Sequence, residues 1–221
     1  MTTRRRDWPL LTGLSALSAV PTFGGALRVA ALSGGAEVTP ANERFFAAPV
    51  PVLLHIAAAV TFSLLGAFQF APGFRHRHRA WHRRAGRLLV GCGLMVAATG
   101  WWMNATYPLP PGDGPLLMVL RYLFAAGMFV AVAAGFVAVR RRRLHQHRAW
   151  MMRGYAIAQG AGTQGVLLST WMLAVGPTTE LSRALLMGAA WTLNLLVAEW
   201  LIRRRPGPVT ATRPATLAAT G

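Results

Sequence analysis

The chain has 221 residues, of which 54% are hydrophobic and only 13% are charged, and its formal net charge is +17. Soluble domains carry roughly 25% charged residues, so this composition argues against a water-soluble protein and favours a membrane protein. The positive charge lies in short arginine clusters between apolar runs, which is typical of membrane-protein loops and excludes nucleic acid as the expected partner.

Six apolar runs follow one another along the chain, and each is long enough to cross a hydrocarbon layer roughly 30 Å thick. They are apolar nearly all round, and a lone segment in hydrocarbon satisfies its own backbone hydrogen bonds only as a helix. None shows the strict alternation of a barrel strand. The sequence therefore predicts an all-α, polytopic transmembrane helix bundle with six spans, at residues 8–32, 49–71, 88–107, 115–139, 154–175 and 184–202.

The first run has a second interpretation as a cleaved signal peptide. It follows basic residues, has an apolar region from Leu10 to Val20, and reaches small residues near Ala30. The apolar stretch is long for a signal peptide and also contains Arg28. We therefore expect a membrane span, with cleavage as the alternative.

Arginine clusters set the expected orientation. They precede the first run, separate the second from the third and the fourth from the fifth, and follow the sixth, whereas the alternate connections hold only Arg44 and Arg183. Under the positive-inside rule every cluster faces the cytoplasm. We therefore expect both termini inside, in the cytoplasmic (inner) membrane of a bacterium. The expected regions are a cytoplasmic N-terminus at 1–7, a membrane domain at 8–202 and a disordered cytoplasmic tail at 203–221.

Two stretches of the chain carry a family resemblance. Their residues are His55, Gly66, Gln69-Phe70 and His82-Arg83 with Gly86-Arg87, followed by HRAWMMRGYA at 147–156. Over roughly residues 45–200 the chain resembles the bacterial predicted-membrane-protein family called domain of unknown function 2306. The resemblance implies a multispan helical membrane protein with no assigned activity. It also implies an arginine late in the fifth span, where this chain has Gln164.

Ionisable side chains inside the spans are costly, and they therefore raise a functional hypothesis. His55 and Arg121 each lie six residues into a span, about 9 Å along a helix from its outer end. Glu43 in the preceding outer loop could reach either. We expect an outer polar pocket formed by His55, Arg121, Arg28, Asn104 and Tyr122. The alternative is a structural cluster, with Arg121 extending to the interface and His55 bonded to a neighbouring helix.

At the cytoplasmic end, histidines and arginines gather in the two connecting loops. The inner basic motifs are His82, Arg83, His147, Arg148 and Arg153. They could bind phosphates of anionic phospholipids at the cytoplasmic face, or could serve only to orient the protein. His78 and His82 have metal-ligand spacing, but the surrounding arginines repel a dication, so we expect no metal site. We expect Glu199 to pair with Arg153 or with a loop arginine.

Haem is the cofactor that the sequence leaves open. A b-type haem needs two axial ligands at matched depth, and His82 and His147 each lie at the cytoplasmic end of a span. No Ser-His-acid arrangement is present, so we expect no catalytic residues and favour a protein that is not an enzyme. Two hypotheses remain: an integral membrane protein that binds or translocates a small molecule or lipid, and a b-type haem redox protein. The oligomeric state is left open.

Overall fold

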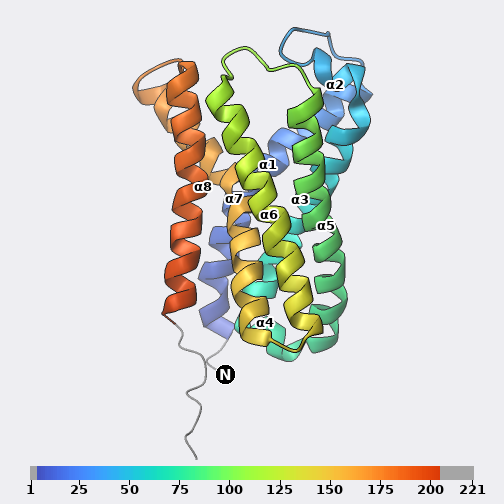
Figure 1. Cartoon of the computed structure of the whole chain (residues 1–221), viewed down its shortest axis with the longest axis vertical. Coiled ribbons are helices and arrows are strands. Elements are labelled where there is room, and N and C mark those ends of the chain that lie inside the picture. The colour runs from blue at the N-terminus through green and yellow to red at the C-terminus, as the bar shows by residue number, and fades with distance from the viewer. Residues whose placement is uncertain (1–3, 205–221) are drawn as a thin grey trace, which may run out of the picture.

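The structure is a computed structural model that describes residues 4–204, which form eight α-helices (Figure 1). The six long helices are α1 (Arg4–Ser33), α3 (Pro49–Phe70), α5 (Arg79–Thr106), α6 (Pro115–Arg140), α7 (Leu144–Ala174) and α8 (Glu180–Arg203). The two short helices are α2 (Glu43–Ala47) and α4 (Pro72–Arg77). Since residues 4–204 contain no strand, the prediction of an all-α protein is confirmed. The tail predicted at 203–221 lies outside the described residues from position 205 onward.

The helix starts follow from local sequence. Pro49, Pro72 and Pro115 each occupy the first turn of a helix, where the missing N–H of proline is not needed. At the start of α8, the backbone N–H of Ser182 donates to the Thr179 hydroxyl, and the N–H of Thr179 donates to the Ser182 hydroxyl. This reciprocal pair satisfies two backbone donors that the first turn of a helix leaves free.

Four long helices begin earlier than the predicted spans, and the difference is largest for α5 and α7. α5 begins at Arg79 and α7 at Leu144, well before the predicted spans at 88–107 and 154–175. His82 and His147 therefore lie in the first turn of a long helix, at the end of a span as the haem hypothesis requires, and not in the connecting loops. Hydropathy marks only the apolar part of a helix, whereas the helical backbone continues through arginine-rich residues.

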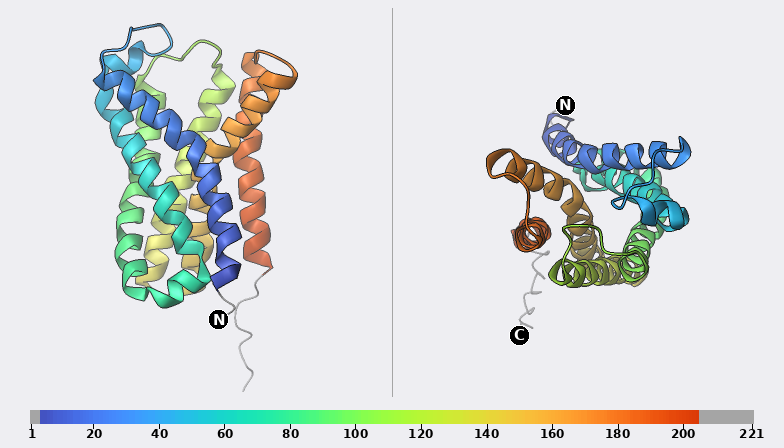
Figure 2. Two further views of the ribbon diagram at one scale, coloured as in Figure 1. Left: turned by 180° about the vertical axis from the view of Figure 1, so that it is seen from behind. Right: turned by 90° about the horizontal axis from the view of Figure 1, so that it is seen from above.

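The long helices pack as a ring of five with one helix outside it. Around the ring, α1 contacts α3, α3 contacts α5, α5 contacts α6, α6 contacts α7, and α7 returns to α1. α8 packs against α6 and α7, and the view from above in Figure 2 shows this arrangement. α7 also contacts α3 across the ring, so it is in contact with four other long helices.

Five of the described helices are long and apolar enough to cross a membrane, namely α1, α3, α5, α6 and α8. α7 has 31 residues but is less apolar, with Gln159 and Gln164 buried in the bundle. A helix enclosed by other helices does not need an apolar surface on every side. The sixth span therefore stays a prediction, and α7 is the helix that would supply it.

Both ends of the described chain lie at one end of the bundle, together with α4 and the connection between α6 and α7 (Figure 1). The four arginine clusters are therefore at this end, which we call the arginine-rich end. The connections α1–α2, α5–α6 and α7–α8 lie at the opposite end. The side of the membrane that each end faces stays a prediction.

The half of the ring nearer the arginine-rich end is closed by a contact between α3 and α7. A methyl group at Gly66 would lie 2.5 Å from Cε2 of Tyr155, so the ring occupies the space that a side chain would fill. The Tyr155 hydroxyl donates to the Ser63 carbonyl at 2.7 Å. Phe62 and Val132 are fully buried beside this contact. This half of the bundle is therefore densely packed.

Buried polar side chains join α1 to the same contact. Nε2 of Gln159 donates to the Tyr155 hydroxyl at 2.6 Å and to Oγ of Ser18 at 3.0 Å. Ser18 in turn donates to the Leu14 carbonyl at 2.8 Å. An unpaired polar group is costly in an apolar interior, so this network is expected to hold α1, α3 and α7 in one arrangement.

We expect Gly66→Ala to lower the free energy of unfolding by about 1–3 kcal/mol, because the Tyr155 ring must move to admit the methyl group. Gly91→Ala is the matched control, since nothing lies within 4 Å of an added methyl group there. Alanine is the better helix former, so this control should be neutral or stabilising by up to about 1 kcal/mol. Thermal unfolding of the purified variants measures both. Equal effects of the two substitutions would contradict the close contact between α3 and α7.

Candidate functional site

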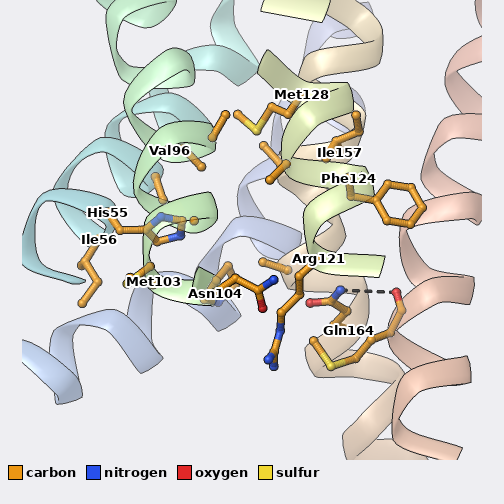
Figure 3. Close-up of a pocket in the computed structure, with 18 of the residues that line it drawn as sticks. His55, Ile56, Val96, Met103, Asn104, Arg121, Phe124, Met128, Ile157 and Gln164 are labelled. Carbon is orange, nitrogen blue, oxygen red and sulfur yellow. Dashed lines mark hydrogen bonds between the residues drawn. The ribbon is translucent and has the colours of Figure 1, made fainter. Parts of the chain in front are cut away.

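A cavity of about 410 Å³ lies inside the bundle, toward the end opposite the arginine-rich end. Sites for small molecules typically enclose about 300–1,000 Å³, so the cavity has the volume of a ligand site. Its wall is mainly apolar, with side chains from all six long helices. The polar and charged side chains in the wall include Arg44, His55, Ser63, Asn104, Arg121 and Gln164. Figure 3 shows several of them converging on one space.

Three of the five residues predicted for the outer pocket line this cavity, namely His55, Asn104 and Arg121. Arg28 and Tyr122 lie outside its wall. The Arg28 guanidinium lies over the Phe45 ring, 4.3 Å from its centroid. The Tyr122 ring packs against Trp101, with centroids 4.8 Å apart. Both residues face neighbouring side chains instead of the cavity.

His55 is held by a hydrogen bond from α3 to α5. Its Nδ1 lies 2.9 Å from Oγ1 of Thr99. The hydroxyl group of Thr99 has one hydrogen, which it donates to the carbonyl of Met95 at 2.6 Å. The carbonyl of Val96 is farther from Oγ1, at 3.3 Å. With this hydrogen on the Met95 carbonyl, Oγ1 is left as the acceptor, and we therefore assign the ring hydrogen of His55 to Nδ1.

The second ring nitrogen of His55 is consequently an acceptor. No carboxylate pairs with His55 among the described residues, and a lone imidazolium inside a membrane protein would be costly, so the ring is neutral. With its hydrogen on Nδ1, the neutral ring has a free lone pair on Nε2. No side chain within residues 4–204 is hydrogen-bonded to Nε2, and the ring, which also lies beside the Val96 carbonyl, lines the cavity. The cavity therefore receives a hydrogen-bond acceptor from α3.

Two amide side chains add further acceptors. Nδ2 of Asn104 donates to the Met118 carbonyl at 3.0 Å, and Nε2 of Gln164 donates to the Met187 carbonyl at 3.3 Å (Figure 3). Because carbonyls accept only from nitrogen, these bonds assign the two amide orientations. Oδ1 of Asn104 is buried and has no partner in the described part of the chain. Oε1 of Gln164 also has no hydrogen-bond partner there.

Asp113 organises the charged residues at the rim. Its side chain is fully buried between two guanidinium groups, with Oδ2 2.5 Å from Nη2 of Arg121 and Oδ1 2.7 Å from Nε of Arg183. These ion pairs attach the α5–α6 connection to α6 and α8. Arg121 therefore pairs with Asp113 and not with Glu43, because the connection turns back over the start of α6 and brings Asp113 beside it.

A second pair of arginines lies at the same rim. The guanidinium groups of Arg28 and Arg44 are 4.3 Å and 4.4 Å from the centroid of the Phe45 ring. Burial, followed by the charge of Arg28, lowers the pKa of the Arg44 guanidinium. The repulsion between Arg28 and Arg44 disfavours a cationic ligand beside them, although the charge of Asp113 partly offsets it.

The inner basic motifs lie at the arginine-rich end, away from the cavity. Nδ1 of His147 lies 2.8 Å from the Gly135 carbonyl and therefore donates to it. Nδ1 of His82 is buried without a partner in residues 4–204. Arg83 is exposed, and Arg148 lies one residue beyond His147 in α7. Within the described residues no group of three His, Cys, Asp or Glu side chains is placed to hold a metal ion.

The predicted pairing of Glu199 with Arg153 is confirmed. The two side chains form a bidentate ion pair, with Nε–Oε1 at 2.5 Å and Nη2–Oε2 at 3.0 Å. Arg153 also lies over the Trp150 ring, 4.8 Å from its centroid. This arginine therefore joins α7 to α8.

Sequence reasoning did not assign Thr99, Asp113 or Gln164 to the site. A threonine inside an apolar run and an acid in a short loop carry no motif, so nothing drew attention to the first two. The available signal for Asp113 was its position two residues before the helix that carries Arg121. Gln164 was noted as the residue at the position of the family's late arginine in the fifth span, but it was not assigned to the pocket.

A family model described as "Predicted membrane protein (DUF2306)" matches residues 52–202, which is more than half of the chain. The match begins just before His55 and extends to the end of α8, so it includes nearly all the helices that enclose the cavity. No curated protein and no solved structure matches the chain.

Proposed function

The chain belongs to this family of predicted membrane proteins, and from that premise we propose that it binds a small, mainly apolar molecule in the cavity. The observation that carries the proposal is the cavity itself, about 410 Å³ inside a ring whose other half is densely packed. An apolar wall with a few convergent polar groups is typical of small-molecule sites. His55, Asn104, Arg121 and Gln164 would orient the ligand.

The packing between the cavity and the arginine-rich end favours a binding site instead of an open passage through the bundle. Phe62, Leu89 and Val132 are buried between the cavity and the arginine-rich end. The hydrogen bonds among Ser18, Tyr155 and Gln159 lie in the same half of the bundle. A molecule in the cavity would meet this packed region before it reached the opposite face.

The cavity faces the outer side in this proposal, and the arginine-rich end faces the cytoplasm of a bacterium. The support is the placement of all four arginine clusters at one end of the bundle. α7 supplies the sixth span, since it packs alongside the other long helices. Anionic phospholipid headgroups at the cytoplasmic face would then meet the arginine-rich end.

Cysteine labelling of intact cells tests this orientation. In a Cys92→Ser background, we expect Pro111→Cys in the α5–α6 connection to react with a membrane-impermeant maleimide. Arg84→Cys, exposed at the arginine-rich end, should react only after the cells are permeabilised. Labelling of Arg84→Cys but not of Pro111→Cys in intact cells would reverse the orientation.

The binding proposal is tested by filling the cavity. We expect 2-bromonaphthalene to cause saturable quenching of tryptophan fluorescence, because its heavy atom would contact Trp191 in the wall. Ala125→Phe places a ring in the cavity and should weaken this binding by about 5- to 150-fold, since overpacking costs about 1–3 kcal/mol.

Ala105→Phe is the matched control, because Ala105 is exposed and is not part of the cavity wall. Trp191→Phe should remove the saturable quenching and so identifies its source. Quenching that is never saturable in the wild type, or that is unchanged by Ala125→Phe, would contradict binding in the cavity.

A second candidate function is a redox protein with a b-type haem bound by His82 and His147. The observation that favours it is the hydrogen bond from Nδ1 of His147 to the Gly135 carbonyl. Metal-ligating histidines usually have one nitrogen bonded in this way and ligate through the other. Arginines at this end could pair with the haem propionates.

A reduced-minus-oxidised absorption spectrum of protein produced with added haem separates the two candidates. The haem candidate predicts a b-type α-band that His82→Ala and His147→Ala each abolish and that His145→Ala leaves in place. A spectrum without such a band removes the haem candidate and leaves the cavity proposal unaffected.

A further inference from the structure

We propose that the cavity ligand is a ring of the hydroquinone type that donates its two hydroxyl hydrogens to Nε2 of His55 and Oε1 of Gln164. The inference rests on the proposed function, since it requires the cavity to be a binding site. It adds the polar chemistry that the ligand must have.

His55 determines the first part of this chemistry. Its Nδ1–H is already donated to Thr99, whose own hydrogen is directed to the Met95 carbonyl. Nε2 therefore presents a lone pair to the cavity. A ligand carbonyl or ether oxygen cannot bond to a lone pair, whereas a ligand hydroxyl can donate to it.

Gln164 provides a second acceptor on another wall of the cavity. Its amide nitrogen is used by the Met187 carbonyl, so Oε1 is the atom that a ligand can engage. Figure 3 shows His55 and Gln164 on opposite sides of the drawn site, with Asn104 and Arg121 between them. A ligand that bridges them needs donors at two ends. Oδ1 of Asn104 is a third acceptor without a partner in residues 4–204.

The wall between these acceptors favours a flat ring. Phe124 and Trp191 stack with centroids 4.6 Å apart and planes at 23°, and both line the cavity. Met103, Met128 and Met187 also line it. Aromatic faces and thioethers both make favourable contacts with aromatic rings.

The arginines at the rim disfavour a ligand that donates hydrogen bonds from an ammonium group. An ammonium group also donates hydrogen bonds, but it would pass Arg44, which lines the cavity, and Arg28 beside Phe45. Like charges repel more strongly in a partly buried setting. A neutral hydroxyl meets the three acceptors without this cost.

Three probes that differ only in their polar groups test the proposal. They are trimethylhydroquinone, its dimethyl ether and trimethyl-1,4-benzoquinone, titrated calorimetrically without oxygen into the full-length protein in lipid nanodiscs. One net hydrogen bond corresponds to about a tenfold change in affinity, so the hydroquinone should bind about 10–100-fold more tightly than the other two. Empty nanodiscs correct for partition into lipid.

Variants then assign the contacts. His55→Leu and Gln164→Leu should each weaken hydroquinone binding about tenfold and leave ether binding unchanged. Gln69→Leu is the matched control, because Gln69 is an amide outside the cavity wall. Thr99→Val removes the acceptor that positions His55 and should weaken hydroquinone binding, while Thr99→Ser should restore it.

The outcomes separate the two levels of the proposal. Ether or quinone binding as tight as that of the hydroquinone would overturn hydroxyl recognition and leave the cavity as a binding site. Failure of all three probes, together with a lack of saturable 2-bromonaphthalene quenching, would overturn both. The comparison of the three probes on the wild-type protein tests hydroxyl recognition even where a substitution prevents folding.

Discussion

The contact between Gly66 and the ring of Tyr155 determines where this bundle is dense and where it is hollow. Because Gly66 has no side chain, α7 approaches α3 closely enough for the Tyr155 hydroxyl to bond to the Ser63 carbonyl. In the half nearer the arginine-rich end, α3 and α7 therefore meet across the centre of the ring of five helices. Toward the other end the same two helices contribute His55 and Gln164 to a cavity of about 410 Å³. The same two helices thus contribute a close contact to the packed half and polar groups to the cavity.

The polar groups within the bundle are of two kinds: some have hydrogen-bond or ion-pair partners in the protein, and others do not. Ser18, Tyr155 and Gln159 bond to one another and to backbone carbonyls, and Asp113 bonds to two arginines. These groups hold helices together, and a ligand would gain little by contacting them. In the described residues, Nε2 of His55 has no side-chain partner, and the side-chain oxygens of Asn104 and Gln164 have no partner. An unmet acceptor inside an apolar wall is costly unless something fills it, and this cost is the physical basis for expecting a hydroxyl-bearing ligand.

The sequence predicted those features that depend on local composition or on depth along a helix. Hydropathy identified the apolar part of each long helix, although it missed the first turns of α5 and α7, which are polar. A fixed rise per residue placed His55 and Arg121 at similar depth, and both line the cavity together with Asn104. Depth does not specify the face of a helix, and for this reason Arg28 and Tyr122 were assigned to the pocket although they point elsewhere. The roles of Thr99 and Gln164 depend on which helices are neighbours, and this information appears only in the folded chain.

The central claim is that the cavity presents the lone pair of His55 Nε2 to its ligand. Nitrogen-15 NMR of protein labelled at histidine tests it directly, with the His55 signals identified by their loss in His55→Leu. The account predicts a neutral imidazole protonated at Nδ1, whose Nε2 resonance shifts on addition of trimethylhydroquinone and not of its dimethyl ether. A ring protonated at Nε2, or at both nitrogens, would contradict it.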